Sequence, residues 1–93
     1  MSESQHTIVI ADDEAHITHV VALKVKNAGY EAVVAHDGEE AYELCLEHEP
    51  SLVITDLQMP YMTGLELAQR LKENPSTASA PVLMLAGRGC ALG

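Results

Sequence analysis

The sequence predicts a doubly wound α/β domain built on a parallel sheet, because short apolar runs of strand length alternate with longer segments of helical period. Four runs are predicted to be strands buried on both faces: Thr7–Ala11, Glu31–Ala35, Leu52–Thr55 and Val82–Leu85. Right-handed crossovers between such strands place helices on both faces of the sheet. The length of 93 residues supports one domain of this kind.

Three helical segments separate these strands, and each has recognisable end signals. The first is predicted to end at Gly29, a residue type favoured just past helix ends. Asp37 is the predicted N-cap of the second helix, with Glu40 three residues on. Thr63 and Glu66 stand in the same relation at the start of the third. The predicted buried faces are Ile17, Val20, Val21, Val25 and Ala28 in the first helix, Ala41, Leu44, Cys45 and His48 in the second, and Gly64, Leu67, Ala68 and Leu71 in the third.

Composition argues against several classes of partner. The formal net charge of −9 disfavours a nonspecific nucleic-acid surface or an anionic membrane face, so we expect neither nucleic acid nor membrane as a partner. No apolar run approaches the length of a membrane span, and the first residues lack the pattern of a secretion signal. The two cysteines, Cys45 and Cys90, have no CxxC spacing. We therefore expect a soluble protein in the reducing cytoplasm.

Three carboxylates follow two of the predicted strands. Asp12 and Asp13 come directly after the first strand, and Asp56 comes directly after the third. Functional groups of open parallel sheets gather beyond the carboxyl ends of the strands, so these side chains are expected to meet in one crevice. Their mutual repulsion is relieved by a cation or a proton. Oxygen ligands without a neighbouring Cys or His favour Mg²⁺ or Mn²⁺ over Zn²⁺.

Simpler roles for these residues must be weighed beside a metal site. Asp12 alone is explained as a cap of the first helix, and Asp13 as a favourable charge in its first turn. Asp56 alone is explained as a strand-end residue that starts a turn. These roles do not explain why three carboxylates converge, and the metal site is therefore the favoured interpretation.

The order and spacing of several motifs together carry more information than any one of them. The motifs are Ile10–Glu14, Asn27–Tyr30, Asp37–Ala41, Asp56–Pro60 and Gly64. In this arrangement the chain resembles the receiver domain of two-component response regulators, over residues 7 to 92. The resemblance implies a flavodoxin-like fold, here with four parallel strands in the order 2-1-3-4 and three helices.

The resemblance also implies a chemistry. A histidine kinase or a phosphotransfer protein would transfer a phosphoryl group to Asp56, with Mg²⁺ as cofactor. Asp13 and Asp56 would bind the metal, Asp12 would act largely through water, and the backbone carbonyl of Gln58 would complete the protein ligands. Receivers of this kind are phosphorylated signalling proteins, and we expect no enzyme.

Two departures from the family pattern shape further expectations. The family usually has Ser or Thr after the fourth strand, where this chain has Ala86. The sequence ends at Gly93, before the last helix, strand and helix of the family and before the lysine on that strand. We therefore expect a truncated domain, with tails at residues 1–6 and 87–93, weakened switching, and a homo-oligomer formed through the uncovered sheet and its edge strand.

Other functions remain open on the sequence alone. One is a receiver-like module that acts by dimerisation or protein interaction and needs no phosphate. Another is a metal-dependent phosphatase with Asp56 as nucleophile, which is disfavoured because Gln58 stands where such enzymes carry a second aspartate. The chain is also consistent with a shortened piece of a longer receiver.

Overall fold

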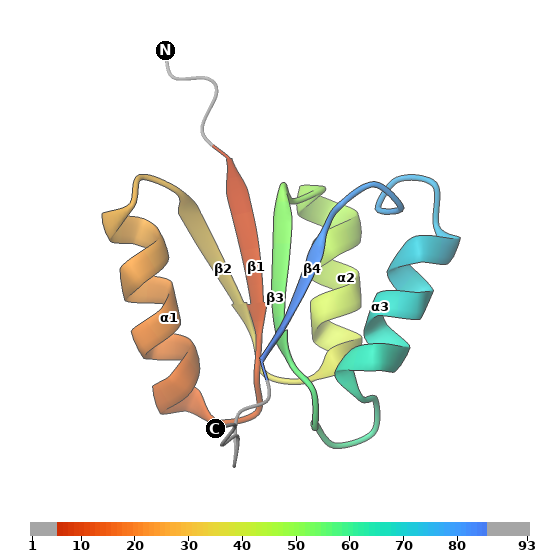
Figure 1. The fold of residues 1–93 in the computed structure, drawn as a ribbon, viewed down its shortest axis with the longest axis horizontal. Helices are drawn as coiled ribbons and strands as arrows, with labels where there is room; N and C mark the ends of the chain where they lie inside the picture. Colours follow the sequence, from red (N-terminus) through yellow and green to blue (C-terminus); the bar gives the residue numbers. More distant parts are fainter. Residues whose placement is uncertain (1–5, 86–93) are drawn as a thin grey trace.

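The computed structural model describes residues 6–85, which form alternating strands and helices (Figure 1). The strands are β1 (Thr7–Ala11), β2 (Glu31–Ala35), β3 (Leu52–Asp56) and β4 (Val82–Leu85). The helices are α1 (Ala15–Asn27), α2 (Gly38–His48) and α3 (Gly64–Glu73). Every predicted strand and helix is present. Strand β3 is one residue longer than predicted, because Asp56 continues the ladder opposite Leu85.

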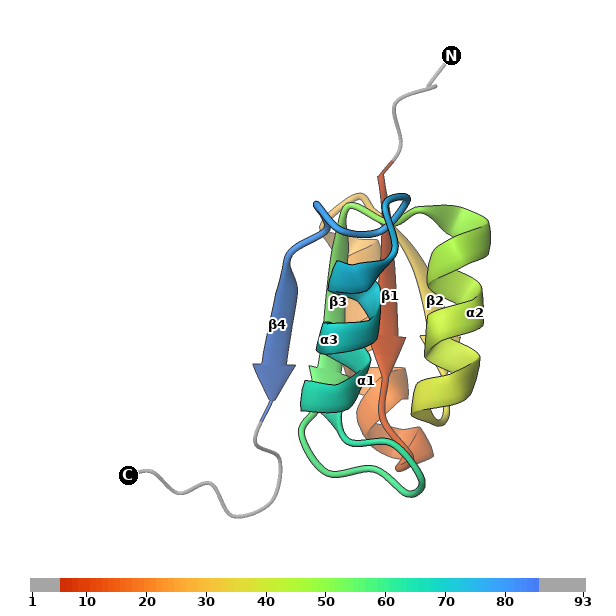
Figure 2. The same ribbon diagram turned by 90° about the vertical axis from the view of Figure 1, so that its right-hand side faces the viewer.

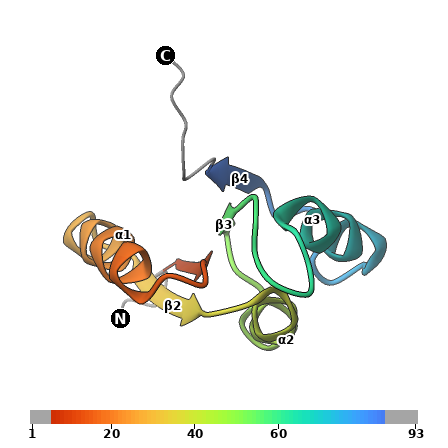
Figure 3. The ribbon, with the colours of Figure 1, turned by 90° about the horizontal axis from the view of Figure 1, so that it is seen from below.

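The four strands form one parallel sheet in the order β2-β1-β3-β4, as predicted. Helix α1 covers one face, and α2 and α3 cover the other (Figure 3). Because all four strands run in the same direction, their N-terminal ends lie together at one end of the sheet and their carboxyl ends at the opposite end, which we call the carboxyl edge. None of the helices among residues 6–85 has the length and hydropathy needed to cross a bilayer.

Strand alternation divides the core between the two faces of the sheet. In β1, Ile8 and Ile10 pack with Val25 of α1, whereas Val9 and Ala11 belong to the cluster on the α2 and α3 side. That second cluster also includes three fully buried residues from β3, α3 and α2: Val53, Leu67 and Cys45. Burial raises the pKa of the Cys45 thiol to about 11, which keeps it protonated and suits a packing role.

The predicted starts of α2 and α3 are confirmed. The Asp37 carboxylate accepts a hydrogen bond from the backbone N–H of Glu40 at 2.8 Å. Thr63 and Glu66 form a complete capping box, in which each side chain accepts from the backbone N–H of the other, at 3.1 Å and 3.0 Å. Helix α1 differs, because its N-cap is Glu14 and no side chain caps it.

Three burial predictions were wrong. In α1, Val20 is half exposed, and the buried face runs through Thr18, Ala22 and Val25 instead. Thr18 can be buried because its hydroxyl donates to the Ala15 carbonyl at 2.9 Å. Ala28, the C-cap of α1, is exposed, as is His48 in the last turn of α2.

The outer strands also differ from the prediction that all four would be buried on both faces. Strand β2 has a single fully buried residue, Ala35, and β4 has none. Leu83 of β4 is half exposed. Burial is highest in β1 and β3 because each has a neighbouring strand on both sides among residues 6–85.

The expected tails, residues 1–6 and 87–93, lie outside the described residues except for His6. The ring nitrogen Nδ1 of His6 lies 2.9 Å from the Ser51 hydroxyl, and its carbonyl accepts the backbone N–H of Glu31. Ala86, at the position where the family has Ser or Thr, also lies outside the described residues.

Candidate metal centre

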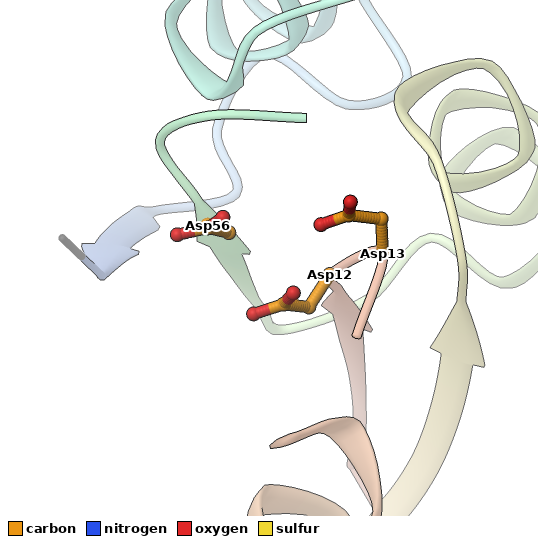
Figure 4. A group of neighbouring side chains, drawn as sticks. All are labelled: Asp12, Asp13 and Asp56. Atoms are coloured by element: carbon orange, nitrogen blue, oxygen red, sulfur yellow. The ribbon is translucent and has the colours of Figure 1, made fainter. Parts of the chain in front are cut away.

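Adjacent strands bring Asp12, Asp13 and Asp56 together at the carboxyl edge of the sheet (Figure 4). Ala11 at the end of β1 pairs with Thr55 of β3, so the residues that follow them, Asp12 and Asp56, emerge side by side. One carboxylate oxygen from each of the three residues lies within 4.8 Å of the other two. The structure therefore brings together the three carboxylates that the sequence analysis placed at this edge.

Two of the three carboxylates are buried. Asp12 and Asp56 are each 6% exposed, whereas Asp13 is exposed. Burial raises the pKa of the Asp12 carboxyl above its ordinary value, and the negative charges of Asp56 and Asp13 raise it further. The site therefore disfavours its own full ionisation, and a bound cation would relieve this cost.

A backbone hydrogen bond holds the Asp12 side chain in place. The N–H of Glu14 donates to Oδ1 of Asp12 at 2.9 Å, which partly offsets the rise in the pKa of that carboxyl. The simpler interpretation of Asp12 as the N-cap of α1 is wrong, because Glu14 occupies that position. Asp12 instead lies at the end of the central strand, where its backbone N–H donates to the Ala35 carbonyl.

The loop after Asp56 returns close to the strand it leaves. The N–H of Gly64 donates to the Leu57 carbonyl at 2.8 Å. A Cβ atom on Gly64 would overlap the carbonyl oxygen of Asp56 and would lie 2.8 Å from Sδ of Met84. Only glycine fits this approach without a backbone shift. The sequence analysis placed Gly64 on a helix face and in a motif, but it did not reveal this contact.

A second glycine contact was missed entirely. A Cβ atom on Gly38 would lie 2.8 Å from Cβ and 2.9 Å from Sδ of Met62. The absence of a side chain at the start of α2 therefore lets Met62 pack against that helix. The sequence signal was the Asp37-Gly38 pair, which was interpreted only as part of a helix start.

Gln58 lies in the same loop, two residues past Asp56, and its side chain is exposed. Its predicted role as a carbonyl ligand stays a prediction. Met59, the next residue, is buried, and its sulfur lies 3.9 Å from the Thr55 hydroxyl. The buried Met59 side chain therefore packs the loop against β3 immediately after Gln58.

The fold and the site together define a class of protein: an open parallel α/β domain with a candidate site for a divalent cation. An open parallel α/β sheet presents three clustered carboxylates beyond the ends of two adjacent central strands. Carboxylate oxygens are the ligands of Mg²⁺ and Ca²⁺, and an open cluster of this size suits an ion that keeps several waters, as Mg²⁺ does. The donor set therefore fits a hard divalent cation.

Comparison with known proteins gives the family. Residues 8–91 match the family described as the response regulator receiver domain, and the chain belongs to this family. It is 37% identical over 83 residues to the phosphate regulon transcriptional regulatory protein PhoB of Pseudomonas aeruginosa, covering 89% of this chain and 36% of that protein. It is also 37% identical to the transcriptional regulator RpaA of a Synechocystis species, covering 88% of this chain and 34% of that protein.

Comparison with solved structures gives the same family. The receiver protein domain from Methanoculleus marisnigri superimposes with a TM-score of 0.84 at 34% identity, covering 94% of this chain and 71% of that one. The chemotaxis regulator CheY4 of Vibrio cholerae gives a TM-score of 0.86 at 29% identity, covering 92% of this chain and 72% of that one. The predicted family and flavodoxin-like fold are confirmed. The chain spans about a third of the length of the curated relatives it matches.

Proposed function

We propose that this receiver domain accepts a phosphoryl group on Asp56 from the phosphohistidine of a histidine kinase or phosphotransfer protein. The observation that carries the proposal is the convergence of Asp12 and Asp13 on Asp56 at the carboxyl edge of the sheet. A carboxylate that attacks phosphorus must approach an anionic group, so it needs a neighbouring cation. The two other carboxylates supply a place to hold one.

In the proposed step, a carboxylate oxygen of Asp56 forms a bond to phosphorus while the bond from phosphorus to the imidazole nitrogen of the donor breaks. The leaving nitrogen keeps the electron pair, and the product is an acyl phosphate. Asp13 and Asp56 would hold Mg²⁺ directly, Asp12 would hold it largely through water, and the carbonyl of Gln58 would complete the set. When bound, Mg²⁺ supplies charge compensation and orients the phosphoryl oxygens.

The same proposal covers the remaining expectations about this chain. Asp56 is consumed as an acceptor in each transfer, so the domain is proposed to act as a signalling protein and not as an enzyme. The absence of a hydroxyl at Ala86 is proposed to weaken the readout of phosphorylation, since one donor to the phosphoryl oxygens is missing. The exchange is proposed to take place in the cytoplasm.

Intact-mass spectrometry tests the proposal. The protein is incubated with Mg²⁺ and acetyl phosphate, and the wild type is expected to gain the mass of one phosphoryl group. Asp56→Asn is expected to gain none. Asp37→Asn is a matched control, because asparagine caps a helix as well as aspartate does and the residue lies outside the carboxylate cluster. An unmodified wild type, or an adduct that persists in Asp56→Asn, would contradict the proposal.

One observation favours a second candidate function, an association module that needs no phosphate. Leu83 projects from the outer strand β4 and is half exposed, and Leu23 of α1 is also half exposed. Exposed apolar residues on an outer strand favour strand pairing between copies. Light scattering across a dilution series tests this, with Leu83→Lys expected to abolish a concentration-dependent rise in mass. A wild type that stays monomeric at every concentration would exclude it.

A further inference from the structure

Thr55 is a fully buried polar residue next to the proposed phosphoryl acceptor. It lies in β3 directly before Asp56 and is 0% exposed. Strand alternation places its side chain on the same face as Val53, in the apolar cluster on the α2 and α3 side of the sheet. Valine has the same shape and a high strand propensity, and it would avoid the cost of burying a hydroxyl among apolar side chains. Strand formation and packing therefore do not explain why a hydroxyl is present here.

The Thr55 hydroxyl contacts the chain that follows it at two places. It donates a hydrogen bond to the backbone carbonyl of Asp56 at 3.0 Å, and it lies 3.9 Å from Sδ of Met59. Met59 is 8% exposed, so its side chain is buried beside the hydroxyl. Asp56 and Met59 are the first and last residues of the segment 56–59, which we call the ligand segment. One buried side chain therefore contacts both ends of this segment.

The ligand segment carries two of the proposed metal ligands, the Asp56 carboxylate and the backbone carbonyl of Gln58. The distance between these two groups depends on the backbone that joins them. The Gln58 side chain is exposed, so burial of that side chain does not fix the position of its carbonyl. The residues on either side of Gln58 must do so.

Backbone hydrogen bonds hold the middle of the ligand segment at Leu57. The Leu57 N–H donates to the Leu85 carbonyl of β4 at 3.0 Å, and the Leu57 carbonyl accepts from the N–H of Gly64 at 2.8 Å. In Figure 2 the loop that contains the segment continues from the arrowhead of β3 to the start of α3. The Thr55 hydroxyl adds contacts on both sides of Leu57, so the ligand segment is fixed along its length.

We propose that Thr55 is a positioning residue for the metal site. Its buried hydroxyl holds the Asp56 carboxylate and the Gln58 carbonyl in the arrangement needed to share one cation. Thr55 acts through the residues that follow it and is itself no ligand. The inference rests on the proposed function and deepens it. Groups that orient metal ligands commonly matter for affinity, and their removal typically weakens metal binding about 10- to 100-fold.

A simpler role for Thr55 predicts a different result. If Thr55 is a β-branched strand residue whose hydroxyl only satisfies its own need for an acceptor, it contributes to stability alone. Replacement by valine would then change the free energy of unfolding and leave the affinity for Mg²⁺ unchanged. The positioning role predicts a lower affinity for Mg²⁺, whatever the change in stability without the ion.

Urea unfolding across a Mg²⁺ titration at constant ionic strength measures both quantities. Unfolding in EDTA gives the stability without the ion, and the increase with Mg²⁺ gives the dissociation constant. Thr55→Val and Thr55→Ala are each expected to raise the dissociation constant about tenfold, because both lack the hydroxyl. Thr55→Ser keeps the hydroxyl and is expected to stay within about twofold of the wild type. With acetyl phosphate as donor, the Mg²⁺ concentration that gives half the maximal rate of phosphorylation is expected to change by the same factors.

Thr77→Val is the matched control. Thr77 is also buried, at 2% exposed, and its hydroxyl donates to the Leu71 carbonyl at 2.7 Å. Helix α3 begins beside Asp56, and about 15 Å of helix separates that end from the end near Thr77. Thr77→Val is therefore expected to lose stability in EDTA and to keep the wild-type dissociation constant for Mg²⁺.

Several outcomes would overturn the inference. An unchanged dissociation constant in Thr55→Val would leave Thr55 with a role in stability alone. A rise in Thr55→Ala that is absent from Thr55→Val would assign the effect to lost volume, and a rise in Thr55→Ser as large as in Thr55→Val would show that the hydroxyl is not the cause. Equal rises in Thr55→Val and Thr77→Val would assign it to general loosening of the fold.

Failure of the inference can be distinguished from failure of the proposed function. A wild type that binds Mg²⁺ and accepts a phosphoryl group, with Thr55→Val equal to it in both, would refute the positioning role alone. A wild type that binds Mg²⁺ but accepts no phosphoryl group would refute the proposed function, and the dissociation constants would still decide the role of Thr55. A wild type that does not bind Mg²⁺ would refute both.

Discussion

Replacing Asp13 by asparagine is expected to change the stability of the protein in opposite directions with and without Mg²⁺. Asp13 has carboxylate neighbours, Asp12 and Asp56, whose oxygens lie within 4.8 Å of its own. At that separation and with the screening of water, each pair of charges repels by about 1 kcal/mol. Asp13 is exposed, so this screening applies. Without Mg²⁺, Asp13→Asn is therefore expected to raise the free energy of unfolding by about 1 to 2 kcal/mol.

With Mg²⁺ bound, the wild type is expected to have the higher free energy of unfolding and Asp13→Asn the lower. An ion that binds only the folded state stabilises it by about 1.4 kcal/mol at ten times its dissociation constant and by about 2.7 kcal/mol at a hundred times. Asp13→Asn removes an anionic ligand, so most of this increment is expected to disappear. For a domain of this size, about 1 kcal/mol shifts the melting temperature by about 4 to 8 °C, which is readily measured.

The assay is thermal and urea unfolding in EDTA and across a Mg²⁺ titration. Asp37→Asn serves as the control and should gain as much from Mg²⁺ as the wild type does. A wild type that gains nothing from Mg²⁺ would show that the three carboxylates are not a working metal site. An Asp13→Asn variant that is less stable than the wild type in EDTA would refute the argument from repulsion.

Three other predictions follow from the same structure. Gly64→Ala is expected to lower the free energy of unfolding, measured in urea, by about 1 to 3 kcal/mol, because the added Cβ would overlap the Asp56 carbonyl oxygen. This loss is expected to exceed the usual gain from alanine in a helix. A stabilised variant would contradict the close approach. Thr63→Ala should cost about 1 kcal/mol in the same assay through loss of the capping box, and Thr63→Ser should retain it. Burial and neighbouring charges raise the pKa of the Asp12 carboxyl in the folded state above its ordinary value of 3.8. Without Mg²⁺, the stabilisation that Asp12 contributes is therefore full at pH values below 3.8 and is lost as the pH rises through the raised pKa of the folded state. Asp12→Asn should remove this part of the slope in unfolding free energy against pH, and identical slopes would refute it.

Local signals in the chain were sufficient for the elements of the fold. The capping residues Asp37 and Thr63 predicted the starts of α2 and α3, and both are observed. The β-branched runs predicted the strands within one residue. The family motifs then predicted the strand order that the sheet has. These features succeed because capping and strand propensity depend on neighbours a few positions away in the chain.

Burial on the helices was predicted less well. The stripe through Val20 fitted helical spacing, but α1 packs on the sheet through Thr18 instead, where an internal hydrogen bond satisfies the hydroxyl. His48 also fitted the buried side of α2 and is exposed. Spacing gives the candidate faces of a helix, but the rotation of the helix against the sheet depends on contacts with strands far away in the chain.

The sequence by itself determined the family, the parallel α/β architecture and the identity of the acidic residues. Strand runs, helix caps and motif spacing depend on residues that are close together in the chain, so they can be recognised without the tertiary structure. Only the tertiary structure decided that Asp12, Asp13 and Asp56 lie within 4.8 Å, that Gly64 touches the strand it follows, and that Tyr61 projects fully into solvent. Each of these depends on packing between segments or on how a loop leaves a strand. Such distances and exposures arise only when the sheet and its helices come together.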